Sequence, residues 1–376
     1  MNKPILYIIT KLELGGAQKV CLALFKGLHE ANKTYLISGT EGPLVEDIKD
    51  HPHVFLLKSL KRELGILGIY HEFRTLFSMV KIIRTVKKQH PTLVVHTHSS
   101  KAGIVGRWAA FFAGVKKRVH TVHNFAFHTH QKKLYSIVAY FLEWSTAFIT
   151  TKFICVSSVQ VTVGKRWIPG FKKKHCLIRA AVESEKFFLP ATQCVGFPEH
   201  QTPFIIGTIS CLRPLKNLPD LLRAFAYAYE QNPFLRLEII GDGIMRSTIE
   251  RIIQQKNLQA VVTLHGWQHS VAPIMQRWHA FVLTSLWEGL PCSAVEARLL
   301  KLPVLCYNTG GIRDVIYHGV NGFVYPQKSW QALAHGMVSI STDALLYMTL
   351  SRYRDTLQEF DTGYMIKKHY ELYQSL

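Results

Sequence analysis

The stretch Phe204–Asn217 reads FIIGTISCLRPLKN, and it shows the strand-to-helix pattern that recurs along the whole chain. Its first part, Phe204–Ile209, is rich in β-branched and aromatic residues, which predicts a strand. The loop that follows carries two cations, Arg213 and Lys216, and leads into a helical pattern. In a parallel α/β sheet, ligands bind at the edge where the strands end. The stretch therefore predicts a strand, a charged loop and a helix with a candidate ligand site between them.

The same alternation of short apolar runs and longer amphipathic stretches extends in both directions. In the first half, strands are predicted at Ile5–Ile9, Thr34–Ile37, Val54–Leu57, Leu93–His96, Val119–Val122 and Phe153–Val156, and helices at Ala17–Glu30, Glu72–Lys88, Ala102–Ala113 and Lys132–Thr150. In the second half, strands are predicted at Phe204–Ile209, Leu235–Ile240, Val261–Leu264, Ala280–Leu283 and Val304–Cys306. This order is typical of α/β proteins with parallel sheets.

The length of 376 residues fits two such domains. Proline and glycine concentrate before the second series of strands, which indicates a linker. We therefore predict a first Rossmann-like domain at 1–190, a linker at 191–203 and a second domain at 204–358. A final helix at 359–376 either completes the second domain or crosses back to the first. Two doubly wound domains are expected to face each other across a cleft.

Positive charge is concentrated in the first half of the chain. The net charge is +20, and residues 73–182 contain 19 Lys and Arg but a single carboxylate, Glu143. Such a field attracts a nucleic acid, an anionic membrane or a phosphate-bearing substrate. The alternative interpretation is that the positive charge serves only to keep the protein soluble.

The cysteines and the apolar segments limit the cellular compartment. Seven widely spaced cysteines without a CxxC pair indicate neither a zinc site nor a disulfide framework, and they suit a reducing compartment. The N-terminal apolar run is too short for a signal peptide. The most apolar segment, Leu134–Thr151, is interrupted by Glu143. We therefore expect a cytoplasmic protein that is at most peripheral to a membrane.

In the second half, further site residues follow the predicted strands. Strand Leu235–Ile240 ends in a glycine turn that begins at Gly241, which suggests room for a ligand. Glu288 lies in the loop after Ala280–Leu283, and Glu296 lies in the helix after it among apolar neighbours. Carboxylates at these positions can accept hydrogen bonds from ribose or sugar hydroxyls, although Glu296 could instead face solvent.

In the first half, the candidates are glycines and histidines. Gly15 and Gly16 follow the first strand and open a helix, where backbone N–H groups can approach a phosphate, although the GxGxxG fingerprint is missing. His96, His98 and His123 lie in two neighbouring strand-end segments. They could form a metal set, but no acidic ligand is near them in sequence, so we expect no metal.

Several motifs together resemble the family-4 glycosyltransferases, which are retaining enzymes of the GT-B fold. In the second half these are Glu-Gly-Leu-Pro from Glu288 through Glu296, Gly-Gly-Ile-Arg-Asp at 310–314 and an Asn-Gly-Phe-Val hairpin at 321–324. In the first half they are Gly-Gly-Ala-Gln at 15–18, the segment 96–103 and Thr-Val-His at 121–123. The resemblance covers approximately residues 5–330.

The resemblance implies a role for each matching residue. It assigns Glu296 to the donor ribose, Glu288 to the transferred sugar, and Arg213 and Lys216 to the donor diphosphate. His123 would lie beside the donor sugar, and His123, Glu288, Arg213 and Lys216 form the catalytic group. The full donor-binding set implied is Gly15, Gly16, Arg213, Lys216, Gly241, Glu288, Gly289, Leu290 and Glu296; Gln18, His98 and Lys101 are acceptor-side candidates.

The sequence also departs from the family pattern Gly-Arg-Leu-x-x-x-Lys-Gly. Cys211 occupies the arginine position, while Arg213 stands two residues later, on the same face of an extended segment. Asn217 replaces the last glycine, and Asp314 replaces the usual glutamate after the Gly-Gly turn.

The expected activity is transfer of a sugar from a nucleoside-diphosphate sugar, with UDP favoured, to a lipid-linked or glycan acceptor. The resemblance indicates a role in cell-surface polysaccharide or lipopolysaccharide synthesis, without a metal cofactor. The excess charge would dock the protein on the inner face of the cytoplasmic membrane. A nucleotide-sugar epimerase or phosphorylase of the same fold is the alternative. Nucleic-acid binding is not expected, because no zinc-finger, helix-turn-helix or aromatic ribonucleoprotein motif is visible.

Overall fold

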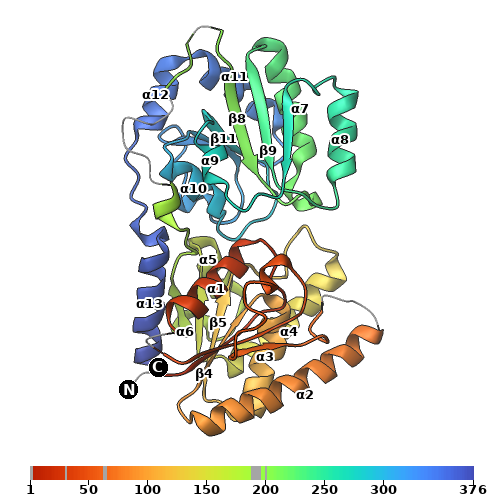
Figure 1. Cartoon of the computed structure of the whole chain (residues 1–376), viewed down its shortest axis with the longest axis vertical. Helices are drawn as coiled ribbons and strands as arrows, with labels where there is room; N and C mark the ends of the chain where they lie inside the picture. The colour runs from red at the N-terminus through yellow and green to blue at the C-terminus, as the bar shows by residue number, and fades with distance from the viewer. Residues whose placement is uncertain (1–2, 30–31, 62–65, 188–195, 200) are drawn as a thin grey trace. The chain divides into compact units, whose positions relative to one another are not determined.

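A computed structural model describes the chain except for residues 1–2, 30–31, 62–65, 188–195 and 200. The chain divides into two compact units (Figure 1). The first unit is Met1–Ala181 together with Glu359–Leu376, and the second is Val182–Gln358. The C-terminal helix, whose path the sequence left open, therefore belongs to the first unit.

The described residues of the first unit form a parallel sheet of seven strands in the order β3-β2-β1-β4-β5-β6-β7. Its strands are β1 Ile5–Ile8, β2 Thr34–Ser38, β3 Val54–Leu56, β4 Val94–His98, β5 Lys117–Val122, β6 Lys152–Cys155 and β7 His175–Leu177. Its helices are α1 Gly16–Gly27, α2 Ile66–Gln89, α3 Ser100–Phe112, α4 Lys133–Ile149, α5 Ser158–Trp167, α6 Phe171–Lys174 and α13 Thr362–Ser375. Strand order reverses between β1 and β4, which makes their carboxyl ends the switch point of this sheet.

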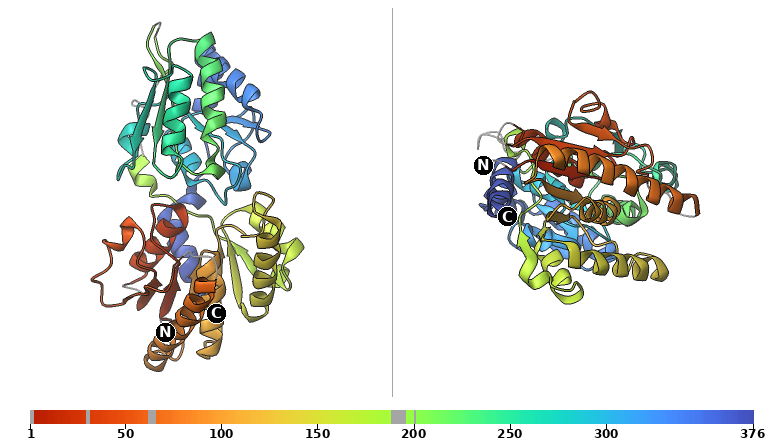
Figure 2. Two further views of the ribbon diagram at one scale, coloured as in Figure 1. Left: turned by 90° about the vertical axis from the view of Figure 1, so that its right-hand side faces the viewer. Right: turned by 90° about the horizontal axis from the view of Figure 1, so that it is seen from below.

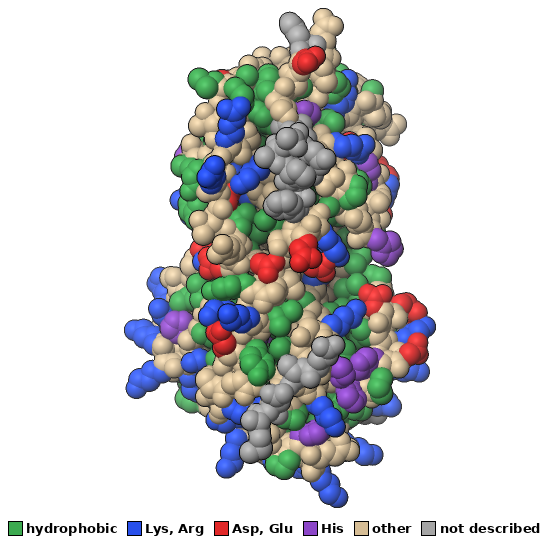
Figure 3. Space-filling model, turned by 60° about the vertical axis from the view of Figure 1, so that its left-hand side comes forward, with side chains coloured by type: hydrophobic (Ala, Val, Ile, Leu, Met, Phe, Trp, Pro, Cys, Tyr) green, Lys and Arg blue, Asp and Glu red, His purple; other side chains and the backbone are tan. Residues whose placement is uncertain are grey.

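Alternation along the central strands sends side chains to two different layers of helices. Leu6, Ile8 and Val95 join the apolar core under α2 and α3, which pack against each other (Figure 2). Tyr7 points to the opposite face, where its hydroxyl accepts a hydrogen bond from Tyr373 of α13 at 3.4 Å. The period of two along a strand explains this division. Lys and Arg side chains project from the surface of this unit in the view of Figure 3.

The second unit has a parallel sheet of six strands in its described part, in the order β10-β9-β8-β11-β12-β13. Its strands are β8 Phe204–Ile209, β9 Leu235–Ile240, β10 Val262–Gly266, β11 Ala280–Leu283, β12 Val304–Tyr307 and β13 Gly322–Tyr325. Its α-helices are α7 Leu218–Gln231, α8 Arg246–Gln255, α9 Ala272–Met275, α10 Cys292–Leu299, α11 Trp330–Thr342 and α12 Ala344–Arg352. The switch point lies between β8 and β11.

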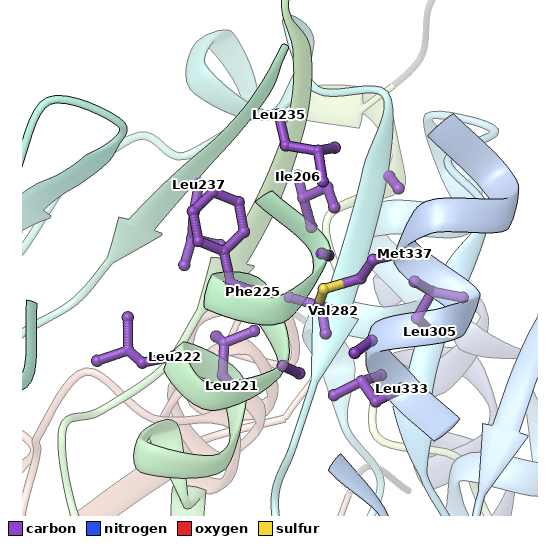
Figure 4. Packing of buried hydrophobic residues seen from close by; sticks show 14 of the residues in the cluster. Ile206, Leu221, Leu222, Phe225, Leu235, Leu237, Val282, Leu305, Leu333 and Met337 are labelled. Carbon is purple, nitrogen blue, oxygen red and sulfur yellow. The ribbon is translucent and has the colours of Figure 1, made fainter. Parts of the chain in front are cut away.

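The core of the second unit lies between the sheet and helices α7 and α11. Ile206, Leu237 and Val282 from the strands pack with Phe225 of α7 and Met337 of α11 (Figure 4). On the other face, a Cβ at Gly207 would meet the ring of the fully buried Trp278 at about 2 Å. A glycine is needed in β8 because the indole packs directly on its backbone.

The predicted strands all exist, but three details of the sequence analysis were wrong or incomplete. The segment 321–324 is not a hairpin: β13 is a parallel edge strand that pairs with β12. Strand β7 was not predicted. Residues 182–190 pack with the second unit as far as they are described, whereas we assigned them to the first domain. The predicted linker at 191–203 lies partly outside the described residues.

Candidate active site

The loop after β8 lies at the switch point of the second sheet. A short 3₁₀ helix, η4 Pro214–Lys216, is followed by Asn217, which adopts a left-handed conformation with φ of 50°. The Asn217 side chain donates to Asp220 Oδ2 at 2.7 Å, and Asp220 is buried in the first turn of α7. Asparagine tolerates left-handed backbone better than most residues, so it fits the position where the family pattern has glycine.

Lys216 forms an ion pair with Glu288, which belongs to the loop after β11. The two side chains are 26% and 14% exposed. Two hydrogen bonds hold the loops together: the Thr284 side-chain Oγ1 donates to the Lys216 carbonyl at 3.0 Å, and Leu286 N donates to the Leu215 carbonyl at 2.8 Å. A cation and a carboxylate predicted from separate motifs thus meet at the switch point.

The glycine turn after β9 supports the loop after β8. Gly241 has φ of +123°, and a Cβ there would lie 2.1 Å from the Ser210 carbonyl oxygen. Gly243 likewise approaches the Leu212 backbone, and Leu212 N donates to the Asp242 carbonyl at 2.9 Å. The space that a Cβ on Gly241 would occupy is therefore filled by the Ser210 backbone. Donor contact by Gly241 stays a prediction.

The loop with Glu288 and Gly289 is fixed by the turn after β12. A Cβ on Gly310 would lie 2.1 Å from the Glu288 carbonyl oxygen, and Gly311 N donates to the Gly289 carbonyl at 2.7 Å. Leu290 is buried, and α10 then carries Glu296, which is 8% exposed. The alternative in which Glu296 simply faces solvent is wrong, because its side chain is largely buried.

Two buried hydroxyl groups at the same edge were not singled out from the sequence. Ser285 Oγ follows β11 and Thr309 Oγ1 follows β12, and neither has a hydrogen-bond partner. Buried hydroxyl groups are normally hydrogen-bonded. The only sequence signal was their position, two or three residues beyond a predicted strand, and that is too common to be specific.

At the switch point of the first sheet, Gly15 is the N-cap of α1 and Gly16 begins it. The Gln18 side-chain oxygen lies 2.7 Å from the place a Cβ on Gly15 would occupy, so Gln18 folds back over the turn. A pair of hydroxyl groups, missed from the sequence, also lies here. Thr10 Oγ1 and Ser99 Oγ are 2.8 Å apart, and Ser99 has φ of +62°. Left-handed backbone at a non-glycine residue is sparsely populated and clusters at functional sites.

Two of the predicted histidines are in direct contact. His98 Nδ1 and His123 Nε2 are 3.0 Å apart, and His98 Nε2 is buried without a partner. Burial, with a smaller contribution from His369, lowers the pKa of His123 to about 3. Burial also lowers the pKa of His98 well below its usual value. Both rings are therefore neutral at pH 7. His98 is fully buried, and its assignment to the acceptor side stays a prediction.

The remaining buried histidines connect this pair to the C-terminal helix. His96 Nδ1 lies 2.5 Å from the hydroxyl of Tyr373, and His96 Nε2 lies 2.7 Å from Thr121 Oγ1. We call five of the histidines of this unit the histidine cluster: His96, His98, His120, His123 and His369. Desolvation lowers the pKa of each of them.

Lys101, the third acceptor-side candidate, lies in α3 and is engaged by α2. Its ammonium lies 2.5 Å from a carboxylate oxygen of Glu72 and also contacts the Lys61 carbonyl. Across the described part of the chain, no group of three or more His, Cys, Asp or Glu side chains has an arrangement that could hold a metal ion.

Two family models match the chain in succession. Residues 14–166 match "Glycosyltransferase Family 4", and residues 196–357 match "Glycosyl transferases group 1". The chain is 30% identical over 342 residues to an Escherichia coli protein, UDP-Gal:alpha-D-GlcNAc-diphosphoundecaprenol alpha-1,3-galactosyltransferase, with 89% of this chain and 86% of that protein covered. The chain therefore belongs to the family-4 glycosyltransferases, as the resemblance predicted, and it is an enzyme of surface polysaccharide or lipid-linked glycan synthesis.

A further relative and two solved structures are also similar to this chain, and the structures show the fold that it shares with them. The capsular polysaccharide glycosyltransferase CapM of Staphylococcus aureus is 24% identical over 310 residues and covers 77% of this chain and 76% of its own length. Anabaena HepE, solved with UDP and glucose, superposes with a TM-score of 0.81 at 20% identity and 99% coverage of both chains. Sucrose-phosphate synthase from Thermosynechococcus elongatus gives 0.83 at 19% identity, covering 100% of this chain and 99% of that one. The fold is GT-B.

Proposed function

We propose that this enzyme transfers a hexose from a UDP-sugar, with retention of anomeric configuration, to a sugar already linked to a lipid diphosphate. The observation that carries the proposal is the meeting of Lys216 and Glu288 at the switch point of the second sheet, with Arg213 on the same loop and Glu296 on the adjoining helix. The printed name of the Escherichia coli relative supports the donor and acceptor classes. UDP and UDP-glucose bound to Anabaena HepE support the nucleotide.

The chemistry requires stabilisation of a leaving diphosphate. The bond between the anomeric carbon and the diphosphate oxygen breaks, and its electron pair leaves with UDP. The acceptor hydroxyl attacks from the same face, and its proton passes to the leaving group. Arg213 and Lys216 would stabilise the developing negative charge, because oriented cations act most strongly where charge develops. Glu288 holds the Lys216 ammonium in place before the donor arrives.

The other predicted contacts complete the proposal. Glu296 would accept hydrogen bonds from the ribose hydroxyls, which suits a carboxylate with only 8% of its surface exposed. Backbone N–H groups at Gly15 and Gly16 would approach the diphosphate. The neutral ring of His123 would contact the transferred sugar.

A nucleotide-release assay tests the donor and the need for an acceptor. UDP-galactose, UDP-glucose, UDP-N-acetylglucosamine and GDP-mannose are each offered with and without N-acetylglucosamine diphosphoundecaprenol. We expect acceptor-dependent release of UDP. Turnover without acceptor would instead favour the epimerase, and turnover that requires free phosphate would favour the phosphorylase. No release with any donor and lipid-linked acceptor would overturn the proposal.

Donor-site variants test the roles of individual side chains. Glu296→Ala should weaken UDP binding at least about tenfold, because it removes charge-assisted hydrogen bonds, whereas Glu230→Ala on the exposed surface of α7 should not. Unchanged UDP affinity in Glu296→Ala would overturn the ribose assignment. The anomeric configuration of the product, measured by NMR, tests retention. Full activity in excess EDTA is expected for transfer without a metal.

The proposed location is the inner face of the cytoplasmic membrane, with the enzyme held peripherally. No helix among the described residues is long and apolar enough to cross a bilayer. The 19 Lys and Arg of residues 73–182 would attract anionic lipids. Cell fractionation should place the enzyme with membranes at low salt. Recovery entirely in the supernatant at low salt would contradict this location.

A further inference from the structure

Helix α4 is packed with its polar side inward. Most of the residues that it buries are small or polar, namely Ala139, Glu143, Thr146 and Ala147, and Ile149 at its last position is the one large apolar residue among them. The residues that it exposes are large and apolar: Leu134 75%, Ile137 52%, Phe141 60%, Trp144 41% and Phe148 61%. These five recur at spacings of three and four, so they form one stripe along the helix. A water-facing helix normally has the opposite arrangement.

The buried side of α4 is held by a specific network. Glu143 Oε2 accepts from Arg107 of α3 at 2.7 Å, and the two side chains are 4% and 0% exposed. Arg107 also donates to Thr150 Oγ1 at 3.1 Å, just beyond the helix end. This network fixes which side of α4 faces inward, so the apolar stripe on the opposite side has to face outward.

The apolar surface continues beyond the helix at both ends. A groove of about 250 Å³ opens beside its first half, and it is lined by Phe127, Ser136, Ile137, Tyr140, Phe141 and Trp167. Near the other end, the Arg118 guanidinium lies 5.4 Å from the ring centre of the exposed Phe111, and Arg118 also contacts the Ile149 carbonyl. The exposed Phe111 and Phe112 at the end of α3 therefore adjoin the end of the stripe.

The charges around this surface are positive. Lys132 and Lys133 are exposed where α4 begins, and Arg166 is exposed beside Trp167. The one carboxylate between residues 73 and 182, Glu143, is buried under the helix. The surface thus combines an apolar stripe with a basic surround, which complements a layer of anionic headgroups over hydrocarbon.

We propose that α4 lies in the plane of an anionic bilayer, with Ile137, Phe141, Trp144 and Phe148 inserted at the boundary between headgroups and acyl chains. The 17 residues of α4 give a contact about 25 Å long, which suits a helix that lies on a membrane. Insertion predicts more than attraction by charge does: part of the binding should survive screening by salt. The inference rests on the proposed function in one respect: a lipid-linked acceptor would explain why the enzyme inserts a helix into a membrane.

Vesicle binding by the full chain tests the inference without any sugar nucleotide. Vesicles of phosphatidylglycerol with phosphatidylcholine are compared with phosphatidylcholine alone, by flotation, at low salt and at about 0.5 M salt. We expect binding to the anionic vesicles that is weakened but not abolished by salt. Complete loss of vesicle binding at high salt would show that attraction by charge alone holds the protein on the vesicles, and it would overturn insertion.

The test variant is the triple change Phe141→Gln, Trp144→Gln and Phe148→Gln. Its partition to anionic vesicles should fall about a hundredfold, because three half-exposed large side chains no longer enter the hydrocarbon. The matched control, Ile244→Gln with Leu345→Gln, removes comparably exposed apolar groups of the second unit and should bind as wild type. Equal binding of the triple variant and wild type would overturn the inference.

Further readouts separate the inference from folding defects, self-association and the proposed function. Brominated lipids should quench wild-type tryptophan fluorescence more than that of Trp144→Phe, which leaves the helix nearly unchanged. A dimer in light scattering that the triple variant abolishes, without vesicle binding by wild type, would assign the stripe to self-association and overturn the inference. Vesicle binding together with no nucleotide release from any donor would reject the proposed function alone.

Discussion

The ion pair between Arg107 and Glu143 allows a quantitative test of how α4 is held. In wild type the Arg107 guanidinium donates to Glu143, to the Gly103 carbonyl at 2.7 Å and to Thr150 Oγ1, and none of its surface is exposed. Glu143→Ala leaves this charge buried with only neutral acceptors. Breaking one side of a buried pair costs about 3–5 kcal/mol, so the first unit should be destabilised by that amount.

Native-state hydrogen exchange is the suitable assay, because two units need not unfold in one transition. Peptides from α3 and α4 should exchange about a hundredfold or more faster in Glu143→Ala, while peptides from α7 and α11 should be unchanged. The double variant Arg107→Met, Glu143→Leu removes both charges and should restore most of the protection. A change below about 1 kcal/mol in Glu143→Ala would refute the claim that the pair is desolvated.

Three further predictions concern catalysis, acid stability and loop geometry. Lys216→Met should lower kcat about a hundredfold or more through lost stabilisation of the leaving group, measured by UDP release, whereas the exposed Lys256→Met should not change kcat. Burial lowers the folded-state pKa of each histidine in the histidine cluster, so the stability that these residues contribute is present above the unfolded pKa of about 6.5 and is lost as pH falls below it. At about pH 5 each buried histidine should therefore lower the free energy of unfolding of the first unit by about 2 kcal/mol, measured by urea unfolding followed through hydrogen exchange. A first unit whose stability does not change with acid would contradict the burial of these histidines. Gly241→Ala should destabilise the second unit by about 2 kcal/mol or more, because Cβ meets the Ser210 carbonyl at positive φ; an unchanged thermal midpoint for this unit would show that the turn can shift.

Strand positions and fold class could be predicted from the sequence because they depend on local pattern. Apolar runs of four to six residues marked β1 and β8 to within a residue of their ends. By contrast, β7 is a three-residue edge strand, His-Cys-Leu, with partly exposed residues, so its sequence carries little apolar signal. The mistaken hairpin at 321–324 arose because an Asn-Gly pair is a turn signal wherever it occurs.

The site could be predicted only in part, for a similar reason. Lys216 and Glu288 stood out because charged residues follow predicted strands and match a family motif. Their pairing depends on strand order, which sequence periodicity does not reveal. The sequence could not show that His98 is buried, because a histidine at a strand end reads the same whether it faces solvent or another histidine.

The return of α13 to the first unit has a consequence for how the chain is made. Lys3 donates to the carbonyls of Tyr373 and Gln374 at 3.2 and 2.9 Å, so residues from the start and end of the chain hold each other. On the ribosome, all of the second unit emerges before the helix that covers Tyr7 and His96. The second unit, although made later, can therefore finish folding first, while the nascent first unit keeps an open flank that chaperones can recognise until α13 emerges.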